Sequence, residues 1–308
     1  MKDLKGYLMI IGAAAFWGAA ATLAKFLLNQ QIDTLLLVQT RSTFSAVTML
    51  VFLLLLSPRA LRIRLTDLWR VAILGILGLA GANFTYYFTI KESTVATAIT
   101  IQYTAALFVM AYEVLTREEQ FTAVKALAAV LSLAGCVCAV TGLDFSVMQI
   151  SSLGLLTGIG SILSFSLMTI LTRHLVAGNS AWTVSFYSIT FAGLFWSCIN
   201  PPWLLPGQIA GTSVWLALVF LAMTSVLIPN LLFTAGLRYL VPTRAIITST
   251  LEPVIAIATA ALFIGERLSV IQLLGAALVI AAIIILQFQK EREAGGRTRF
   301  EPEVNNAA

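Results

Sequence analysis

The sequence has few charged residues. Asp, Glu, Lys and Arg make up 11% of its 308 residues, whereas soluble domains carry about 25%. Hydrophobic residues make up 59%. A soluble fold of this length has no interior large enough to hide so much apolar surface, and its sparse charge would leave it poorly soluble. The composition excludes a soluble globular enzyme, a disordered chain and a nucleic-acid-binding protein, and it indicates a protein whose solvent is lipid.

Residue types that serve metal and redox chemistry are also scarce. The chain has one histidine, His174, and three cysteines, Cys136, Cys138 and Cys198, which lie in or beside apolar runs. An odd number of cysteines without neighbouring His or acidic ligands predicts neither a disulfide framework nor a metal site. No ATP-binding motif of the Gly-x4-Gly-Lys-Ser/Thr kind occurs. We therefore predict no metal, no cofactor and no catalytic residue.

Long apolar runs account for most of the chain. A membrane-spanning helix needs about 20 residues, and the predicted fold class is an all-α polytopic membrane protein with ten transmembrane helices. The first run is too long for the apolar region of a cleaved signal peptide, and the tail at 291–308 is polar enough to be disordered. The ten expected segments are 7–28, 33–56, 68–90, 94–115, 121–141, 153–175, 181–199, 213–236, 243–264 and 270–288.

Positive residues gather at alternate connections. If the N-terminus is placed inside, 15 of the 19 Lys and Arg residues fall on the inner side. Lys25, Lys91 and Arg267 fall outside, and Arg41 lies within a segment. Cytoplasmic loops carry such an excess of Lys and Arg. We therefore expect both termini in the cytoplasm.

The two halves of the sequence resemble each other. A shift of 147 residues pairs Asn83 with Asn230, Lys91 with Arg238 and Glu119 with Glu266. We expect a first repeat at 1–145 and a second at 146–290, each with five spans. Five is an odd number, so the repeats must be inverted relative to each other. Inverted repeats are typical of secondary transporters, which hold substrate near the midplane between the halves.

Two charged residues are expected deep in the membrane, where charge is costly and usually faces a cavity or a partner. Arg41 could bind a substrate carboxylate through two parallel hydrogen bonds, or it could extend to the interface or pair with a backbone carbonyl or Glu252. Glu252 precedes Pro253, which cannot donate a helical hydrogen bond. Its carboxylate could carry a proton or bind an amine, or it could satisfy backbone groups that Pro253 leaves unpaired.

Uncharged polar and aromatic residues also occur within the spans. Asn83 and Tyr86 are three residues apart and share a helix face. Amide, phenol and indole groups on such faces could bind a small polar solute, or they could make hydrogen bonds between helices. With the two charged residues, the candidate substrate-binding set is Trp17, Gln39, Arg41, Asn83, Tyr86, Gln102, Tyr103, Asn230 and Glu252.

Short motifs in three segments carry a family resemblance. They are Trp17-Gly18 followed by Lys25, then Arg41, and then Leu251-Glu252-Pro253 followed by Gly265-Glu266-Arg267-Leu268-Ser269. With these motifs the chain resembles the ten-helix EamA-type branch of the drug/metabolite transporter superfamily over about residues 6–290. The first repeat departs from the pattern, since Ala105 and Ala106 stand where Glu252 and Pro253 pair. The expected segment 153–175 carries Phe165-Ser166 in place of Trp-Gly.

The resemblance implies alternating-access transport of small metabolites such as amino acids or related compounds, commonly as export across the bacterial inner membrane. Expected partners are a small-molecule substrate and the lipid bilayer, with Glu252 as the candidate for coupling to protons and no nucleic acid. The chain is expected to act as a monomer or homodimer. An integral-membrane enzyme and a channel are the alternatives. An enzyme needs a reactive cluster of His or acidic residues and a channel needs a ring of selectivity groups, and the sequence indicates neither.

Overall fold

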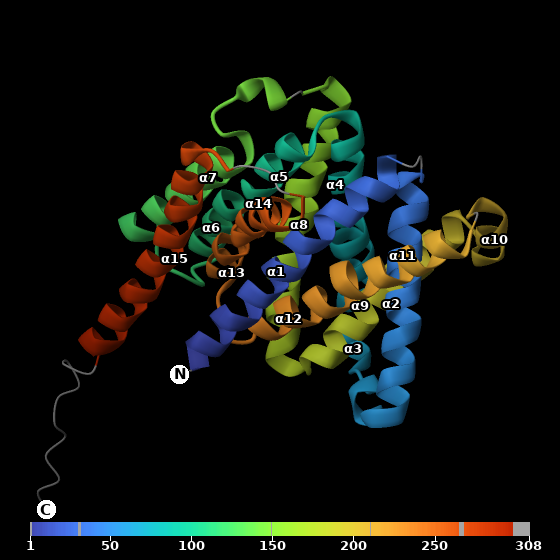
Figure 1. Ribbon diagram of the computed structural model, residues 1–308. Helices are drawn as coiled ribbons and strands as arrows, with labels where there is room; N and C mark the ends of the chain where they lie inside the picture. The colour runs from blue at the N-terminus through green and yellow to red at the C-terminus, as the bar shows by residue number, and fades with distance from the viewer. Residues whose placement is uncertain (1, 30–31, 149, 210, 265–267, 298–308) are drawn as a thin grey trace, which may run out of the picture.

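The computed structural model describes residues 2–29, 32–148, 150–209, 211–264 and 268–297, and within these ranges the regular structure is helical (Figure 1). The first half contains α1 (Lys2–Asn29), α2 (Thr34–Leu56), η1 (Pro58–Leu61), α3 (Leu65–Ile73), η2 (Leu74–Ala80), α4 (Gly81–Glu92), α5 (Val95–Tyr103), α6 (Ala105–Leu115), α7 (Ala123–Thr141) and η3 (Phe145–Val147). The second half contains α8 (Ser152–Gly178), α9 (Ala181–Ile199), η4 (Pro202–Leu204), α10 (Leu205–Gln208), α11 (Thr212–Ala222), η5 (Met223–Leu227), α12 (Ile228–Gly236), α13 (Pro242–Ser249), α14 (Leu251–Ile264) and α15 (Val270–Arg297).

Nine of the ten expected segments form helices long and apolar enough to cross a membrane within the described ranges. Some of these spans are built from several elements. For example, α3, η2 and α4 together form the span Leu65–Glu92. The expected segment 243–264 is not among these nine, and it is divided into α13 and α14 on either side of Thr250. The prediction of an all-α polytopic membrane protein is confirmed, but its ninth segment is a broken helix.

The two halves share their irregularities as well as their polar residues. η2 and η5 are π-helical, with hydrogen bonds from residue i+5 to residue i. Shifted by 147 residues, Leu74–Ala80 falls on 221–227, which contains η5. The break at Thr104 between α5 and α6 likewise falls within one residue of the break at Thr250. These shared breaks support the predicted repeat.

Glycines bring several helices into backbone contact. α7 and α15 lie side by side at one edge of the molecule (Figure 1), and a Cβ atom on Gly135 would lie 2.7 Å from the carbonyl oxygen of Gly275. α1 packs against α12 and α14. A Cβ atom on Gly18 would lie only 2.6 Å from the carbonyl oxygen of Glu252. The Trp17-Gly18 motif therefore packs directly on the Glu252-Pro253 motif, and this contact positions the site described below.

The N-terminal end of α1, the connection after α2 and the C-terminal end of α15 all lie towards the lower part of Figure 1. We call this the basal end of the molecule. The connection between α8 and α9 reaches the same end, where it lies beside the Pro58–Leu61 turn. The basal end is the one that the distribution of Lys and Arg assigns to the cytoplasm.

Candidate functional site

A cavity lies between α1, α2, α4, α5, α8, α12 and α14 in the described part of the chain. The centres of water-sized molecules could occupy about 80 Å³ of it, which is several times the 10–15 Å³ or so that one water needs. Eight of the nine candidate residues line this cavity. They are Trp17, Arg41, Asn83, Tyr86, Gln102, Tyr103, Asn230 and Glu252.

Gln39 lies elsewhere. Its side chain is fully buried, its Nε2 donates to the carbonyl of Asn200 at 2.5 Å, and its Oε1 accepts from Nδ2 of Asn200 at 2.8 Å. Asn200 also bonds to the amide of Gln208. This amide cluster ties α2 to the end of α9 and to α10. Gln39 therefore makes hydrogen bonds between helices, the role that was the alternative to binding a solute.

Arg41 enters the cavity with most of its donors unused. The residue is 2% exposed, its Nε and Nη1 have no hydrogen-bond partner, and Nη2 lies 3.4 Å from the carbonyl oxygen of Ser225. Its guanidinium lies over the Tyr87 ring, 4.7 Å from the ring centroid. The four ion pairs among the described residues include neither Arg41 nor Glu252. No carboxylate in the described part of the chain thus pairs with this positive charge.

Two prolines explain which backbone groups face the cavity. Ser225 lies in the π-helical turn η5 and Ser249 is the last residue of α13. A continuous α-helix would pair their carbonyls with the N–H groups of residues 229 and 253. Both donor positions are prolines, Pro229 and Pro253, which have no N–H. The carbonyl of Ser225 accepts instead from Trp17 Nε1 at 3.2 Å and, more weakly, from Arg41.

The carbonyl of Ser249 is satisfied in the same way by a cavity residue. The Tyr103 hydroxyl lies 2.7 Å from this carbonyl and 2.7 Å from Oε2 of Glu252. A single phenolic proton serves both acceptors. The hydrogen bond expected to compensate for Pro253 is therefore made by Tyr103, while Glu252, 8% exposed, presents its carboxylate to the cavity.

The amides of the cavity are only partly used by the protein. Asn83 Nδ2 donates to the carbonyl of Leu79 at 2.8 Å, and Gln102 Nε2 donates to Oγ of Ser161 at 3.0 Å. The Oδ1 atom of Asn230 is buried without a partner. Asn83 and Asn230 are the pair related by the 147-residue shift. Because buried polar atoms are costly when unpaired, these groups are suited to hydrogen-bond a polar solute.

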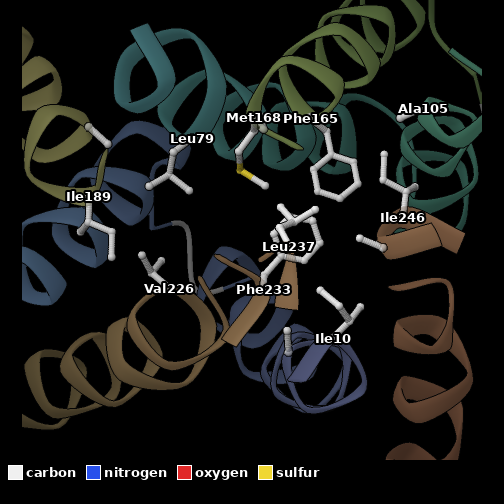
Figure 2. Packing of buried hydrophobic residues seen from close by; sticks show 14 of the residues in the cluster. Ile10, Leu79, Ala105, Phe165, Met168, Ile189, Val226, Phe233, Leu237 and Ile246 are labelled. Atoms are coloured by element: carbon white, nitrogen blue, oxygen red, sulfur yellow. The ribbon is translucent and has the colours of Figure 1, made fainter. Parts of the chain in front are cut away.

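Aromatic and apolar side chains form the rest of the wall. Phe165 lies 6.0 Å from Phe233 and 6.3 Å from Tyr103, between ring centroids. Figure 2 shows Phe165 and Met168 of α8 directed towards Phe233 of α12. Phe165 is thus a wall residue, and it belongs to the Phe165-Ser166 pair that stands in place of the expected Trp-Gly.

Several lining residues were absent from the candidate set, and some had a signal in the sequence. Along the span that ends in α4, the lining residues Leu79, Ala82, Asn83, Tyr86, Tyr87 and Ile90 recur every three or four positions. This spacing defines one helix face, so Tyr87 could have been inferred from Asn83 and Tyr86. Ser225 contributes a backbone carbonyl, whose only signal is the proline four residues later.

Glu113 is a second buried acid, outside the cavity lining. It is 2% exposed and accepts hydrogen bonds from the hydroxyl of Thr243 and, at 3.3 Å, from its backbone N–H. These bonds hold the end of α6 against the first turn of α13. Glu113 therefore joins a helix of the first half to a helix of the second half.

Comparison with known proteins bears on the whole chain. The model of the EamA-like transporter family matches it twice, over residues 4–141 and 152–288. An uncharacterized transporter of Archaeoglobus fulgidus is 30% identical over 215 residues, which cover 68% of this chain and 75% of the relative. The uncharacterized inner membrane transporter YicL of Salmonella typhimurium is 24% identical over 94% of this chain and 97% of its own length.

The fold has a solved counterpart. A crystal structure with 19% sequence identity superposes with a TM-score of 0.76, covering 93% of this chain and 98% of that one. At this identity the likeness concerns the fold alone. The apolar spans and the matched relatives identify an integral membrane protein and a transporter. With both halves matched by the same family model, the chain belongs to the EamA-like transporter family.

Proposed function

We propose that this transporter carries small zwitterionic metabolites, amino acids or related compounds, out of the cytoplasm by alternating access around the cavity. The observation that carries the proposal is that Arg41 and Glu252 line one cavity without forming an ion pair. Two opposite charges buried apart are each costly. A bound zwitterion would supply a carboxylate for Arg41 and an ammonium group for Glu252.

The remaining lining fits the same class of solute. Arg41 still has Nε and Nη1 to donate to a carboxylate, and a guanidinium binds carboxylates through paired donors. The amide oxygen of Asn230 can accept from an ammonium group. The rings of Trp17, Tyr86 and Phe165 provide an apolar surface for a side chain.

Coupling and orientation form part of the proposal. Glu252 is the acid in the cavity lining, so we assign it the exchange of a proton for substrate. The two halves would work as inverted repeats divided near residue 146, with both termini in the cytoplasm and the chain in the bacterial inner membrane. Export then means release on the side opposite the basal end.

A charge-deletion series tests the substrate class. The stability of the purified protein is measured against an amino acid, its N-acetyl form and its methyl ester, because a ligand that binds the native state raises the unfolding temperature. We expect stabilisation by the free amino acid alone. In Arg41→Gln the preference for a free carboxylate should disappear, and in Glu252→Gln the preference for a free amine should disappear.

Exposed positions provide matched controls. Arg70→Gln and Glu118→Gln make the same chemical changes outside the cavity, where the side chains are 54% and 35% exposed, and they should bind as wild type does. Equal binding of all three compounds by the wild-type protein would overturn the zwitterion proposal. For coupling, proteoliposome flux is measured with and without a pH gradient, and gradient-dependent flux that persists in Glu252→Gln would overturn the proton role.

A further inference from the structure

A second concave site lies at the basal end, away from the cavity between the halves. It is a cleft between the Pro58–Leu61 turn with the residues after it and the connection from α8 to α9. Arg59, Arg62 and Arg64 line one side of it, and Asn179, Ser180 and Trp182 line the other. We propose that this arginine cleft binds the phosphate headgroup of an anionic phospholipid.

The positive charge of the cleft favours binding of an anion. Its lining contains three arginines and no acidic residue, and none of the three belongs to an ion pair among the described residues. The nearby Asp67 is already engaged, because it pairs with Arg70 at 3.8 Å and accepts from Asn179 Nδ2 at 2.9 Å. Guanidinium groups bind phosphate through paired hydrogen bonds, so the three unneutralised arginines suit a phosphate group.

The backbone of α9 adds to the positive electrostatic potential of the three arginines. α9 begins at Ala181 on the wall of the cleft, and its N-cap Ser180 accepts a hydrogen bond from the N–H of Thr183. The N-terminal end of a helix carries partial positive charge and is a common site for phosphate. The helix end and the arginines therefore favour the same ligand from opposite sides of the cleft.

The surroundings indicate that the phosphate belongs to a lipid. The cleft adjoins the end of α2, where Leu54, Leu55 and Leu56 are 55%, 77% and 70% exposed. Trp182 in the cleft wall stacks on Phe52 of α2, with ring centroids 5.2 Å apart. Tryptophan is enriched at the membrane interface. Exposed leucines, an aromatic pair and arginines thus lie close together at the end of α2, and these are the groups that suit the acyl chains, the interface and the phosphate of a phospholipid.

Basic pockets between transmembrane helices are a known means of holding anionic headgroups, and each Lys or Arg near an anionic surface contributes about 1 kcal/mol. That free energy corresponds to a factor of about five in affinity. Loss of all three cleft arginines should thus weaken binding of an anionic lipid by roughly a hundredfold.

The test compares two triple variants of the full chain in detergent. The cleft variant replaces Arg59, Arg62 and Arg64 by Gln. The outer variant replaces Lys5, Arg117 and Arg238 by Gln, and it removes the same amount of charge from exposed positions outside the cleft. Binding of phosphatidylglycerol and phosphatidylcholine is measured by native mass spectrometry and by the shift in unfolding temperature. We expect the wild type and the outer variant to prefer phosphatidylglycerol and the cleft variant to lose that preference.

The possible results separate the sources of an anion. Equal binding of the two lipids by the wild type, or equal losses in both triple variants, would overturn the cleft as a specific site. Competition by inorganic phosphate at the concentration at which phosphatidylglycerol binds would assign the cleft to a soluble anion and overturn the lipid. If the cleft variant fails to fold, the single variants Arg62→Gln and Arg64→Gln should each weaken binding about fivefold, and unchanged binding in both would overturn the proposal.

Discussion

Replacing Gly18 by alanine should disturb the site through one close backbone contact. The added Cβ atom would lie 2.6 Å from the carbonyl oxygen of Glu252 and 3.1 Å from the backbone nitrogen of Ala256. Ordinary contact begins at 3.4 Å, so α1 and α14 would have to separate by roughly 0.8 Å. Overpacking of this kind costs about 1–3 kcal/mol. The partner is backbone, so a change of side-chain rotamer cannot relieve the contact.

Gly12 in the same helix provides the matched control. A Cβ atom there would meet only Cδ1 of Leu232, at 3.2 Å, and that terminal methyl group can turn aside. Both variants replace a helical glycine of α1 by alanine, so both gain the same helix propensity and this gain cancels when their stabilities are compared. Gly18→Ala should therefore be less stable than Gly12→Ala by about 1–3 kcal/mol.

Equilibrium unfolding in mixed micelles measures that difference, and ligand-induced thermal shifts report on the site. Because binding groups must be held to within about 0.5 Å, we also expect Gly18→Ala to bind substrate more weakly than Gly12→Ala. Equal unfolding midpoints and equal affinities would refute the argument that the Trp17-Gly18 motif positions Glu252.

Three further substitutions have defined expectations. Tyr103→Phe removes the donor shared by Glu252 and the Ser249 carbonyl; it should lower the free energy of unfolding by about 1–3 kcal/mol and reduce transport, and wild-type values of both would contradict the shared bond. Gln39→Leu should cost a similar 1–3 kcal/mol or so in the same unfolding assay while leaving substrate affinity unchanged, and a loss of affinity would return Gln39 to the binding set. Lys125→Met leaves Glu119, 27% exposed, without its partner at 2.5 Å; screening by solvent limits the expected loss of stability to about 1 kcal/mol, and a measured loss above about 3 kcal/mol would mean that this pair is effectively desolvated.

The sequence was sufficient to predict the spans and most of the polar residues that line the cavity, because both follow from the cost of placing polar groups in lipid. A polar residue within an apolar span must face a partner or a cavity, which selected Arg41, Asn83 and Glu252. Hydropathy does not say which of these two surroundings a residue has. Gln39 and Arg41 are two residues apart, about 200° around a helix, so one helix orientation could not bring both into the same cavity.

The breaks in the helices were harder to predict. The segment at 243–264 was expected to form one helix, but it divides at Thr250, within the largely polar stretch that runs from Thr248 to Glu252. The π-helical turns at Leu74–Ala80 and Met223–Leu227 have no compositional signature. Their positions depend on tertiary packing against other helices, for instance that of Gly75 against the backbone of α9. Such contacts join residues far apart in the sequence.

Pro229 and Pro253 have no N–H to donate, and the carbonyl oxygens of Ser225 and Ser249 accept from side chains instead. Substitution of either proline can therefore change the bonding of a backbone oxygen. Pro253→Ala would place an N–H four residues after Ser249, where a continuous helix has its donor, and this N–H would compete with the Tyr103 hydroxyl for the Ser249 carbonyl. Pro229→Ala would do the same for the carbonyl that Trp17 and Arg41 now share. A backbone oxygen cannot itself be mutated, but replacing the proline four residues later adds an N–H donor and so changes the hydrogen bonds that this oxygen can accept. The acceptor pattern of the cavity can thus be rewritten without changing any side chain that lines it.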